Sequence, residues 1–337
     1  MTRAAPALFS LCLSGCAWRQ GALQPLGPKA LWIAELGALF FWIALTVLSL
    51  MVIAALWACW RGTRNADAAE EPLRAPAPTT ERQLTRAVAA STVVSLVLLA
   101  VMLVASVATG RNLADFAPVR PLRVKVTGHQ WWWYIEYQGR HPDEQVVTAN
   151  ELHVPAGIPV ELELTSADVI HSFWIPNLDG KHDLIPSRTV KTIIQADAPG
   201  AYAGRCAEFC GYQHAHMDLL VVAEPPEKFR AWLAAQGQPA SEPQTPGERR
   251  GRELVETGAC ATCHTVAGTQ ALGGVGPNLS HLASRRTLAT GAAALDAQSL
   301  RDWIQNPQRL KPGTQMPAVN LSADDLSAVV AYLETLR

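Results

Sequence analysis

Two thiols, two imidazoles and a thioether lie within residues 206–217, which read CAEFCGYQHAHM. Soft sulfur ligands combined with imidazole favour copper over hard cations. The two cysteines are four positions apart, and a turn at Gly211 would bring both thiolates into the same small volume. These residue types at this spacing predict a copper-binding loop. The donors are Cys206, Cys210, His214, His216 and Met217.

The donor set predicts two metal ions. Both thiolates, an imidazole, the thioether and a histidine from elsewhere would overcrowd a single ion, whereas two ions can share the thiolates. The distant histidine is His171, in the segment 168–174, DVIHSFW. A lone histidine followed by a C-terminal Cys/His/Met loop is the spacing that a cupredoxin sandwich gives when two loops meet at one end.

Two other interpretations of the loop stay open. A disulfide between Cys206 and Cys210 is possible in an oxidising compartment, but it leaves the clustered histidines and methionine without a role. A zinc site is disfavoured because the two-residue cysteine spacing of zinc ribbons is absent and Met217 is a poor zinc ligand. Copper accounts for more of the donors than either alternative.

A second redox motif occupies residues 260–264, CATCH. This is the Cys-X-X-Cys-His signature of covalent c-type haem attachment. A methionine in the segment 312–317, PGTQMP, lies where the sixth iron ligand is expected, and Met opposite His suits electron transfer. A thioredoxin-like pair is disfavoured, because no strand-helix-strand pattern surrounds the motif. The expected haem residues are Cys260, Cys263, His264 and Met316.

Two apolar stretches precede these motifs. Residues 31–60 carry only Glu35, and residues 87–109 carry no charge. Each exceeds the roughly 20 helical residues that a bilayer core requires. The loop between them, 61–86, is rich in arginine and should face the cytoplasm. A helical hairpin in the bacterial inner membrane follows, with the copper and haem motifs on the periplasmic or extracytoplasmic side.

Residues 1–16 read as a bacterial lipoprotein signal, in which Cys16 would be lipidated and become the mature N-terminus. In an ordinary signal, Cys16 would be only a small apolar residue. The 49% of apolar residues, the eleven tryptophans and the net charge of −1 fit membrane spans joined to compact domains. This composition excludes a nucleic-acid binder on electrostatic grounds.

From residue 118 to 235 the pattern changes to short strands separated by Pro or Gly, which predicts an antiparallel sandwich followed by a helix at 226–236. Residues 236–247 form a polar, proline-bearing linker. Residues 248–337 alternate helices with loops and end in an amphipathic helix from Ser322, as a small haem-binding domain would. The predicted strands are 122–127, 146–148, 151–154, 159–165, 189–195 and 217–223.

Together these features resemble subunit II of the haem-copper cytochrome c oxidases, of the bacterial caa3 kind with a class I cytochrome c domain at the C-terminus. The resemblance covers essentially the full length, and its specific elements are the copper loop, His171, the haem motif and the aromatic run 128–137, GHQWWWYIEY. It implies two transmembrane helices, an all-β cupredoxin-like sandwich and a small all-α cytochrome c domain. It also implies oxidase subunits I and III, membrane lipid, and cytochrome c or another electron donor as partners.

The resemblance implies a role for each matching residue of the copper loop. Cys206 and Cys210 would bridge a dinuclear copper centre, called Cu A. His171 and His214 would be its terminal imidazole ligands, and Met217 a weak axial ligand.

Two further roles follow from the resemblance. Glu208 would bind copper through its carbonyl and, through its carboxylate, a Mg²⁺ or Mn²⁺ ion shared with subunit I, which suits a hard oxygen ligand. Trp131, the first tryptophan of the aromatic run, would be where electrons enter. It could instead be a core aromatic, although side-chain alternation makes at least one of three consecutive tryptophans face away from the core.

One position departs from the family pattern. Many subunits II carry a glutamate at the start of the second span that opens a proton-uptake channel, but the corresponding stretch here contains Thr85. Glu81, one helical turn earlier, could replace it, or could be an exposed charge beside Arg82. The two histidines without a role, His216 and His281, are expected at the surface.

The implied function is electron input to a proton-translocating cytochrome c oxidase. An external donor would reduce the haem, and electrons would pass to Cu A and then to subunit I, where O₂ is reduced. The flexible linker would raise the effective concentration of the haem domain near the copper. The alternatives are the Cu A subunit of a nitric oxide reductase-type complex and a membrane-tethered copper-delivery protein. A quinol oxidase subunit is disfavoured, because that branch lacks the copper ligands.

Overall fold

The computed structural model describes residues 21–64, 78–116, 121–139 and 145–337. The expected signal peptide of residues 1–16, with its lipidation site Cys16, lies outside the described residues and stays a prediction. The chain divides into two compact units. Leu31–Ala117 forms one unit, and Met1–Ala30 with Pro118–Arg337 forms the other.

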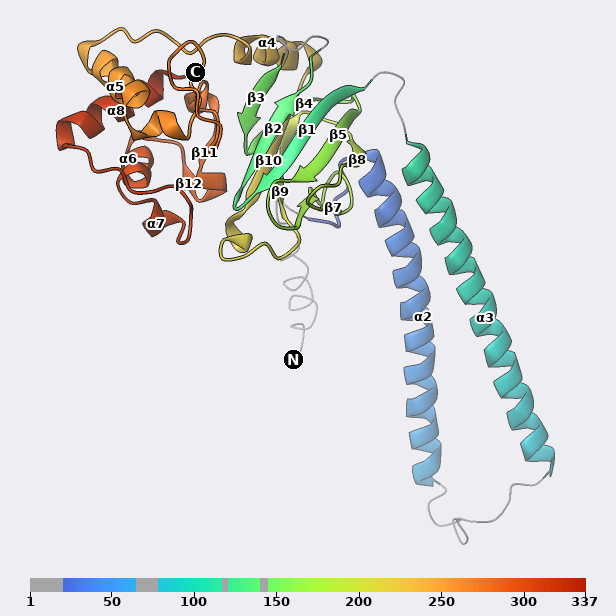
Figure 1. The fold of residues 1–337 in the computed structure, drawn as a ribbon. Helices are drawn as coiled ribbons and strands as arrows, with labels where there is room; N and C mark the ends of the chain where they lie inside the picture. The colour runs from blue at the N-terminus through green and yellow to red at the C-terminus, as the bar shows by residue number, and fades with distance from the viewer. Residues whose placement is uncertain (1–20, 65–77, 117–120, 140–144) are drawn as a thin grey trace, which may run out of the picture. The chain divides into compact units, whose positions relative to one another are not determined.

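Two long helices make up the first unit, α2 (Pro28–Arg64) and α3 (Pro78–Asp115) (Figure 1). Both are long and apolar enough to cross a membrane. Large apolar side chains point outward along them; Trp42 is 63% exposed and Leu103 65%. Such a continuous apolar surface suits lipid rather than water.

The helices extend beyond the apolar stretches that predicted them. Helix α3 begins at Pro78, nine residues before the stretch 87–109, because a helix can continue past the bilayer into polar sequence. Glu81 lies in its first turn, and its backbone carbonyl accepts a hydrogen bond from the Thr85 hydroxyl at 2.9 Å.

A sandwich of two five-stranded sheets opens the second unit (Figure 1). Its strand orders are β3-β2-β1-β5-β8 and β4-β10-β9-β6-β7. The strands are β1 (Leu122–His129), β2 (Trp132–Tyr137), β3 (Val146–Ala149), β4 (Glu151–Pro155), β5 (Val160–Ser166), β6 (His171–Trp174), β7 (His182–Leu184), β8 (Val190–Ile194), β9 (Gly200–Cys206) and β10 (Asp218–Glu224).

All six predicted strands occur, with ends shifted by at most two residues. The prediction of a wholly antiparallel sandwich was wrong, because β1 pairs in parallel with β5 and β10 in parallel with β4. These partners are separated by other elements, so their direction depends on the path of the whole chain. Sequence reasoning also missed β2, β6, β7 and β9, which carry the aromatic run, His171 and Cys206.

Alternating apolar side chains of the two sheets meet in one core. Strand β5 shows the pattern, since Val160, Leu162 and Leu164 are fully buried and the residues between them are partly exposed. Trp133 is also fully buried and packs edge-on against Phe173 of the facing sheet, with ring centroids 5.9 Å apart. This core fixes the ends of β6 and β9, where the copper loop begins.

Helix α4 (Pro226–Gln236) follows the sandwich, and the rest of the chain is mainly helical. Helix α5 (Pro246–Thr257) starts with a capping box between Thr245 and Glu248. Helix α8 (Ala323–Thr335) is N-capped by Ser322, as the sequence predicted. The shorter elements are η5 (Ala259–Thr262), η6 (Leu282–Ser284), β11 (Thr287–Leu288), η7 (Ala289–Gly291), β12 (Ala293–Ala294), α6 (Ala297–Gln305) and α7 (Pro307–Leu310).

Candidate copper and haem sites

The copper loop connects β9 to β10 at one end of the sandwich. Cys206 is the last residue of β9, and its backbone N–H donates to the Met217 carbonyl at 2.9 Å, which closes the loop. Gly211 has a φ of +109°, a left-handed conformation that favours glycine, so it makes the turn that the sequence predicted. A single turn of 3-10 helix, η4 (His214–His216), returns the chain to β10.

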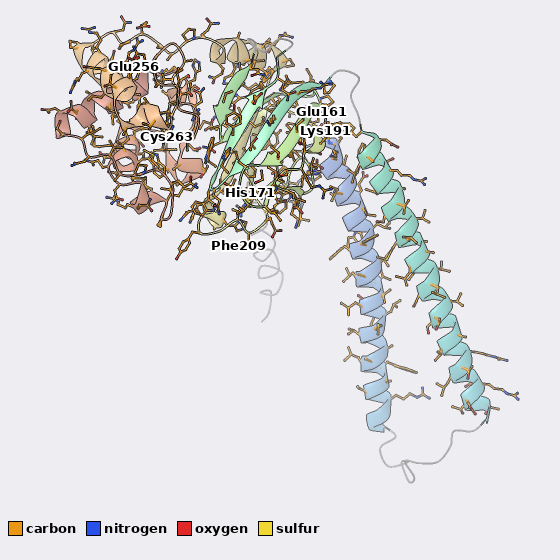
Figure 2. All side chains as sticks on the ribbon, viewed as in Figure 1. Glu161, His171, Lys191, Phe209, Glu256 and Cys263 are labelled. Carbon is orange, nitrogen blue, oxygen red and sulfur yellow. The ribbon has the colours of Figure 1, made fainter. Side chains whose placement is uncertain are left out.

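The structure brings the predicted copper ligands together. The donor atoms of His171, Cys206 and Cys210 all lie within 4.8 Å of one another, and all three side chains are buried. Cys206 Sγ is 3.8 Å from His171 Nδ1, and Cys210 Sγ is 3.7 Å from His214 Nδ1. Figure 2 shows His171 at this end of the sandwich.

Two weaker donors complete the cluster. Met217 Sδ lies 3.8 Å from Cys210 Sγ, and the Glu208 carbonyl oxygen lies 3.2 Å from Cys206 Sγ. Met217 is fully buried, whereas the Glu208 side chain is exposed. The sulfur and imidazole donors form a soft set, which suits copper, whereas the exposed Glu208 carboxylate is a hard donor.

The ring of His171 is oriented by Asp168. Asp168 Oδ1 is 2.8 Å from His171 Nε2, and a carboxylate can only accept, so the proton sits on Nε2 and Nδ1 faces the thiol of Cys206. Burial alone would lower the pKa of His171, but the contacts with Cys206 and Asp168 outweigh it and raise the pKa. Such outer partners set the orientation and basicity of a metal-binding imidazole.

The two thiols influence each other directly. Their mutual hydrogen bond, with a further contribution from His171, lowers the pKa of Cys206 to about 3 and raises that of Cys210. A thiolate is therefore available at neutral pH in a buried site, and thiolate is the form that ligates metals. Both cysteines are free, so the alternative of a disulfide between them is not present in this structure.

The haem motif opens onto a cavity of about 230 Å³. Met316 lines the same cavity as the motif, although 52 residues of chain separate it from His264. The walls are mostly apolar and include Leu282, Trp303 and Val319. Figure 2 labels Cys263, the residue that directly follows η5 as its C-cap. The predicted haem residues that line the cavity are Cys260, Cys263, His264 and Met316.

The His264 ring is held from its outer side. Its Nδ1 is 2.7 Å from the Pro277 carbonyl, which can only accept, so Nδ1 carries the proton and Nε2 is left for iron. Burial lowers the pKa of His264, which keeps the imidazole neutral and able to ligate. Gly276 passes so close that a Cβ there would lie 2.6 Å from His264 Cε1.

The cavity also contains a cationic group with one unsatisfied hydrogen-bond donor among the described residues. Arg285 lines the cavity, and its guanidinium donates to the Asn278 carbonyl, but its buried Nε has no hydrogen-bond partner. A c-type haem carries propionate carboxylates, which are acceptors for such a group. The cysteines, the axial pair, the apolar walls and this arginine all fit a c-type haem.

Trp131 connects the two sites. Its indole Nε1–H donates to the Cys210 carbonyl at 2.9 Å, and the same side chain lines the haem cavity. Trp131 and Trp132 are both half-buried, while Trp133 belongs to the core. The expectation that strand alternation turns at least one of the three tryptophans away from the core is confirmed.

Of the two histidines without a role, His216 is exposed as expected. The expectation that His281 lies at the surface was wrong. His281 is only 5% exposed, and its two ring nitrogens lie 3.0 Å from the Gln238 carbonyl and 2.9 Å from the Arg337 carbonyl. It ties the linker to the C-terminus, which explains why a polar side chain is buried there.

Several residues that shape the sites escaped sequence reasoning. Gly128 is one, because a Cβ there would lie 2.8 Å from His171 Cδ2. Gln130 is another, since its Nε2 donates to the Cys210 carbonyl at 2.7 Å. The position of Asp168, three residues before a candidate ligand, could have indicated its role from the sequence. The roles of Gly128, Gln130 and Gly276 could not be recognised in this way, because they depend on contacts between segments that are far apart in the chain.

Comparisons with known proteins agree with this arrangement. Residues 122–224 match the family model described as cytochrome c oxidase subunit II, periplasmic domain, and residues 248–337 match the model for cytochrome c. Cytochrome c oxidase subunit 2 of Alkalihalophilus pseudofirmus is 32% identical over 337 residues, 98% of this chain and 95% of that protein. Cytochrome c oxidase subunit 2 of Bacillus sp. strain PS3 is 30% identical over 264 residues, 73% of each chain.

A crystal structure of the periplasmic domain of subunit II of cytochrome oxidase from Bradyrhizobium japonicum is 29% identical; it covers 35% of this chain and 95% of that one, with a TM-score of 0.33. The chain belongs to the cytochrome c oxidase subunit II family and carries a cytochrome c domain at its C-terminus. It is thus a subunit of a haem-copper oxidase, with copper and haem as its cofactors.

Proposed function

We propose that this chain takes electrons from cytochrome c or another external donor through its own c haem and passes them to a dinuclear Cu A centre. From there they continue to subunit I, where O₂ is reduced to water with proton translocation. When bound, the haem and the copper pair supply one-electron redox chemistry. The observation that carries the proposal is Trp131, which lines the haem cavity and also hydrogen-bonds the Cys210 carbonyl.

The proposed copper ligands are the six residues whose donor atoms converge at the end of the sandwich. Cys206 and Cys210 would hold both copper ions through their thiolates, which is supported by the different imidazole that lies beside each sulfur. Their buried position excludes water and holds the geometry constant during electron transfer. The complete set is His171, Cys206, Glu208 (through its carbonyl), Cys210, His214 and Met217.

Cys260 and Cys263 would attach the haem, and His264 and Met316, which line the same cavity, would ligate its iron. The Pro277 carbonyl fixes the ring of His264, and the Arg285 guanidinium receives a propionate. The Glu208 carboxylate is exposed beside the copper cluster, which supports its proposed role on a Mg²⁺ or Mn²⁺ ion shared with subunit I.

Other exposed side chains of the copper loop support the proposal that this loop docks onto subunit I. Phe209 and Tyr212 are 74% and 88% exposed, which is unusual for large side chains. Helices α2 and α3 anchor the chain in the bacterial inner membrane beside subunits I and III. With the arginine-rich loop in the cytoplasm, the two redox domains lie on the periplasmic side.

The metal assignment is tested on the complete chain matured with haem and copper. We expect two copper ions and one covalent haem per chain, with a paramagnetic resonance signal split by two equivalent copper nuclei. A single copper ion with an isolated-copper signal would contradict the dinuclear centre. The terminal acceptor is tested with the purified complex, for which we expect consumption of O₂; consumption of nitric oxide alone would point to the reductase alternative.

The electron path is tested by Trp131→Phe, which keeps an aromatic ring and removes the N–H that contacts Cys210. We expect haem-to-copper electron transfer to slow while both cofactors remain bound. Trp132→Phe is the matched control, because Trp132 stacks on His129 and makes no hydrogen bond to the copper loop in the structure described. Equal rates in the two variants would contradict a path through Trp131.

A further inference from the structure

Lys311 is a buried lysine at the boundary between the copper domain (residues 118–235) and the cytochrome domain (residues 248–337). Its side chain is 3% exposed, and an unpaired lysine is almost never buried so completely. Among the described residues, its hydrogen-bond partners are three backbone carbonyls and one hydroxyl. Its ammonium therefore depends on neutral oxygen acceptors.

Those acceptors come from both domains. Lys311 Nζ donates to the carbonyls of Trp131 and His216, at 2.7 and 3.0 Å, which belong to the copper domain. It also donates to the Ala289 carbonyl at 3.3 Å and to the Thr290 hydroxyl, both in its own domain. Burial of the ammonium costs free energy that only a complete set of acceptors offsets, so the contact selects one arrangement of the two domains.

A second polar contact runs in the opposite direction. Glu151, in β4 of the copper domain, is 1% exposed. Its Oε1 accepts hydrogen bonds from the backbone N–H groups of Arg286 and Thr287, at 2.6 and 3.0 Å. The copper domain thus contributes a buried carboxylate, and the cytochrome domain a buried ammonium, to one interface.

The segment between these contacts has an unusual backbone. Ala289, Thr290 and Gly291 have φ values of +51°, +61° and +88°, and this conformation is unfavourable for a β-branched residue such as threonine. It directs the Thr290 hydroxyl to the His216 carbonyl, 2.8 Å away in the copper domain. Strained conformations persist only where surrounding contacts hold them, so the segment is shaped to fit the copper domain.

The interface also forms part of the haem cavity. Lys311 and Thr290 line that cavity together with Trp131, His264 and Met316. A shift of the cytochrome domain would therefore move Trp131 relative to the axial ligands. Rigid docking adds to the effect of the linker, which by itself only raises local concentration.

We propose that Lys311 is a positioning residue that locks the cytochrome domain onto the copper domain in a single orientation, with Trp131 as a wall of the haem cavity. Glu151 secures the other side of the same interface. The inference rests on the proposed electron path, because it assigns this orientation as the one from which electrons leave the haem. It adds to that path the two residues that keep the donor and acceptor in place.

The test uses the assembled oxidase with Lys311→Met, which keeps the aliphatic chain and removes the ammonium. Glu151→Leu removes the acceptor on the other side and serves as an independent second variant. Lys228→Met is the matched control, because Lys228 is exposed on α4. Three quantities are measured: hydrogen exchange of the peptide that contains Arg286 and Thr287, the rate of haem-to-copper electron transfer after flash photoreduction, and the midpoint potentials of both cofactors.

We expect both interface variants to speed exchange of the 286–287 amides and to slow electron transfer, each by about tenfold, the shift that follows from losing one set of buried hydrogen bonds. The cofactor content should not change, and Lys228→Met should match the wild type. Because Lys311 lines the haem cavity, its loss also changes the charge beside the haem, and the measured potentials separate that change of driving force from a change of orientation. Unchanged exchange, or faster exchange with an unchanged transfer rate, would overturn the proposal.

Failure of the proposed function has a different signature. If the wild-type oxidase shows no haem-to-copper transfer, the electron path is wrong whatever the variants do. Faster exchange of the 286–287 amides in both interface variants would then still support a locked orientation, and unchanged exchange would overturn it.

Discussion

The copper loop and the haem pocket hold their ligands in two different ways. In the copper loop, the donor atoms of His171, Cys206 and Cys210 already lie within 4.8 Å of one another. In the haem pocket, the proposed ligands line a cavity of about 230 Å³. The ring of His264 is fixed there by a neighbour, the Pro277 carbonyl.

The difference follows from what surrounds each site. The sandwich has an extensive core, in which apolar side chains of both sheets, among them Trp133, Phe173 and Leu219, pack against one another. In the cytochrome domain, Leu282 and Trp303 line the haem cavity, so the cofactor completes the core. A metal cluster can be added to a finished scaffold, whereas a large apolar cofactor is part of the scaffold itself.

The largest effect is expected when the haem is removed. In a Cys260→Ser, Cys263→Ser double variant, an unfilled cavity of about 230 Å³, at roughly 24 cal/mol per Å³, would cost the cytochrome domain up to about 5.5 kcal/mol. That is comparable with the whole stability of a small domain. Calorimetry of the detergent-solubilised chain should show this domain's transition lost or shifted far down in temperature.

The matching change at the copper site should leave its domain folded. Cys210→Ser removes a proposed bridging thiolate, and metal analysis should show the loss of copper. The unfolding transition of the copper-free variant should stay close to that of the copper-free wild type, within about 1 kcal/mol. Equal destabilisation of both domains would contradict the distinction between an added metal and a structural cofactor.

A pair of glycines gives the next largest effect. A Cβ at position 128 would lie 2.8 Å from His171 Cδ2, and one at position 276 would lie 2.6 Å from His264 Cε1. Gly128→Ala should cost about 1–3 kcal/mol of copper-domain stability, because His171 is buried and cannot move aside. Gly276→Ala should mainly alter the haem spectrum, because the added methyl group would press against the ring of His264, the proposed iron ligand.

The two glycine variants are compared by thermal unfolding and by optical spectra of the matured chain. Gly37→Ala is the control, since nothing lies within 4 Å of a Cβ at that position. A destabilisation of the copper domain by Gly276→Ala equal to that by Gly128→Ala would argue against separate scaffolds.

Asp168→Asn should weaken copper binding without unfolding the sandwich. The amide oxygen can still accept from His171 Nε2, but the negative charge that raises the basicity of the imidazole is lost. Substitution of a residue that hydrogen-bonds a metal ligand typically lowers the metal affinity about 10–100-fold. Competition with a copper chelator measures the effect. An affinity equal to that of the wild type would show that the packing of His171, and not Asp168, sets its orientation.

The smallest expected effect is on the pH dependence of copper-domain stability. His153 stacks on Trp232, with centroids 4.0 Å apart, and burial lowers its pKa although Glu224 acts in the opposite direction. Below the ordinary histidine pKa the unfolded chain therefore binds a proton that the folded domain does not, so copper-domain stability falls as pH decreases through this range. His153→Gln should remove that part of the pH dependence. The cytochrome-domain transition in the same scans should be unaffected.

Much of the site chemistry could be predicted from sequence, because the donors of the copper loop are close together in the chain. Cys206 to Met217 form one loop, and the CATCH motif carries three of the four haem residues. Local spacing limits which atoms can meet, so residue type and interval were informative there. The six predicted strands had the alternating pattern of half-buried β-structure.

Features that depend on contacts between residues far apart in the sequence could not be predicted in this way. The parallel pairing of β1 with β5 and the burial of His281 result from the path of the whole chain. The aromatic run and the residues of β9 lack a clean alternation, so β2 and β9 were missed. Glycines beside the ligand rings have no signal in one sequence, since glycine is common in loops.

The sequence by itself determined which chemistry this protein carries: soft donors for copper, a covalent haem motif, and two apolar segments for a membrane. These follow from residue type and short intervals, which do not change on folding. Only the tertiary structure decided that Trp131 borders both sites and that Lys311, 180 residues away, donates to its carbonyl. Contacts of that kind arise from the summed packing of two domains, which no local pattern encodes.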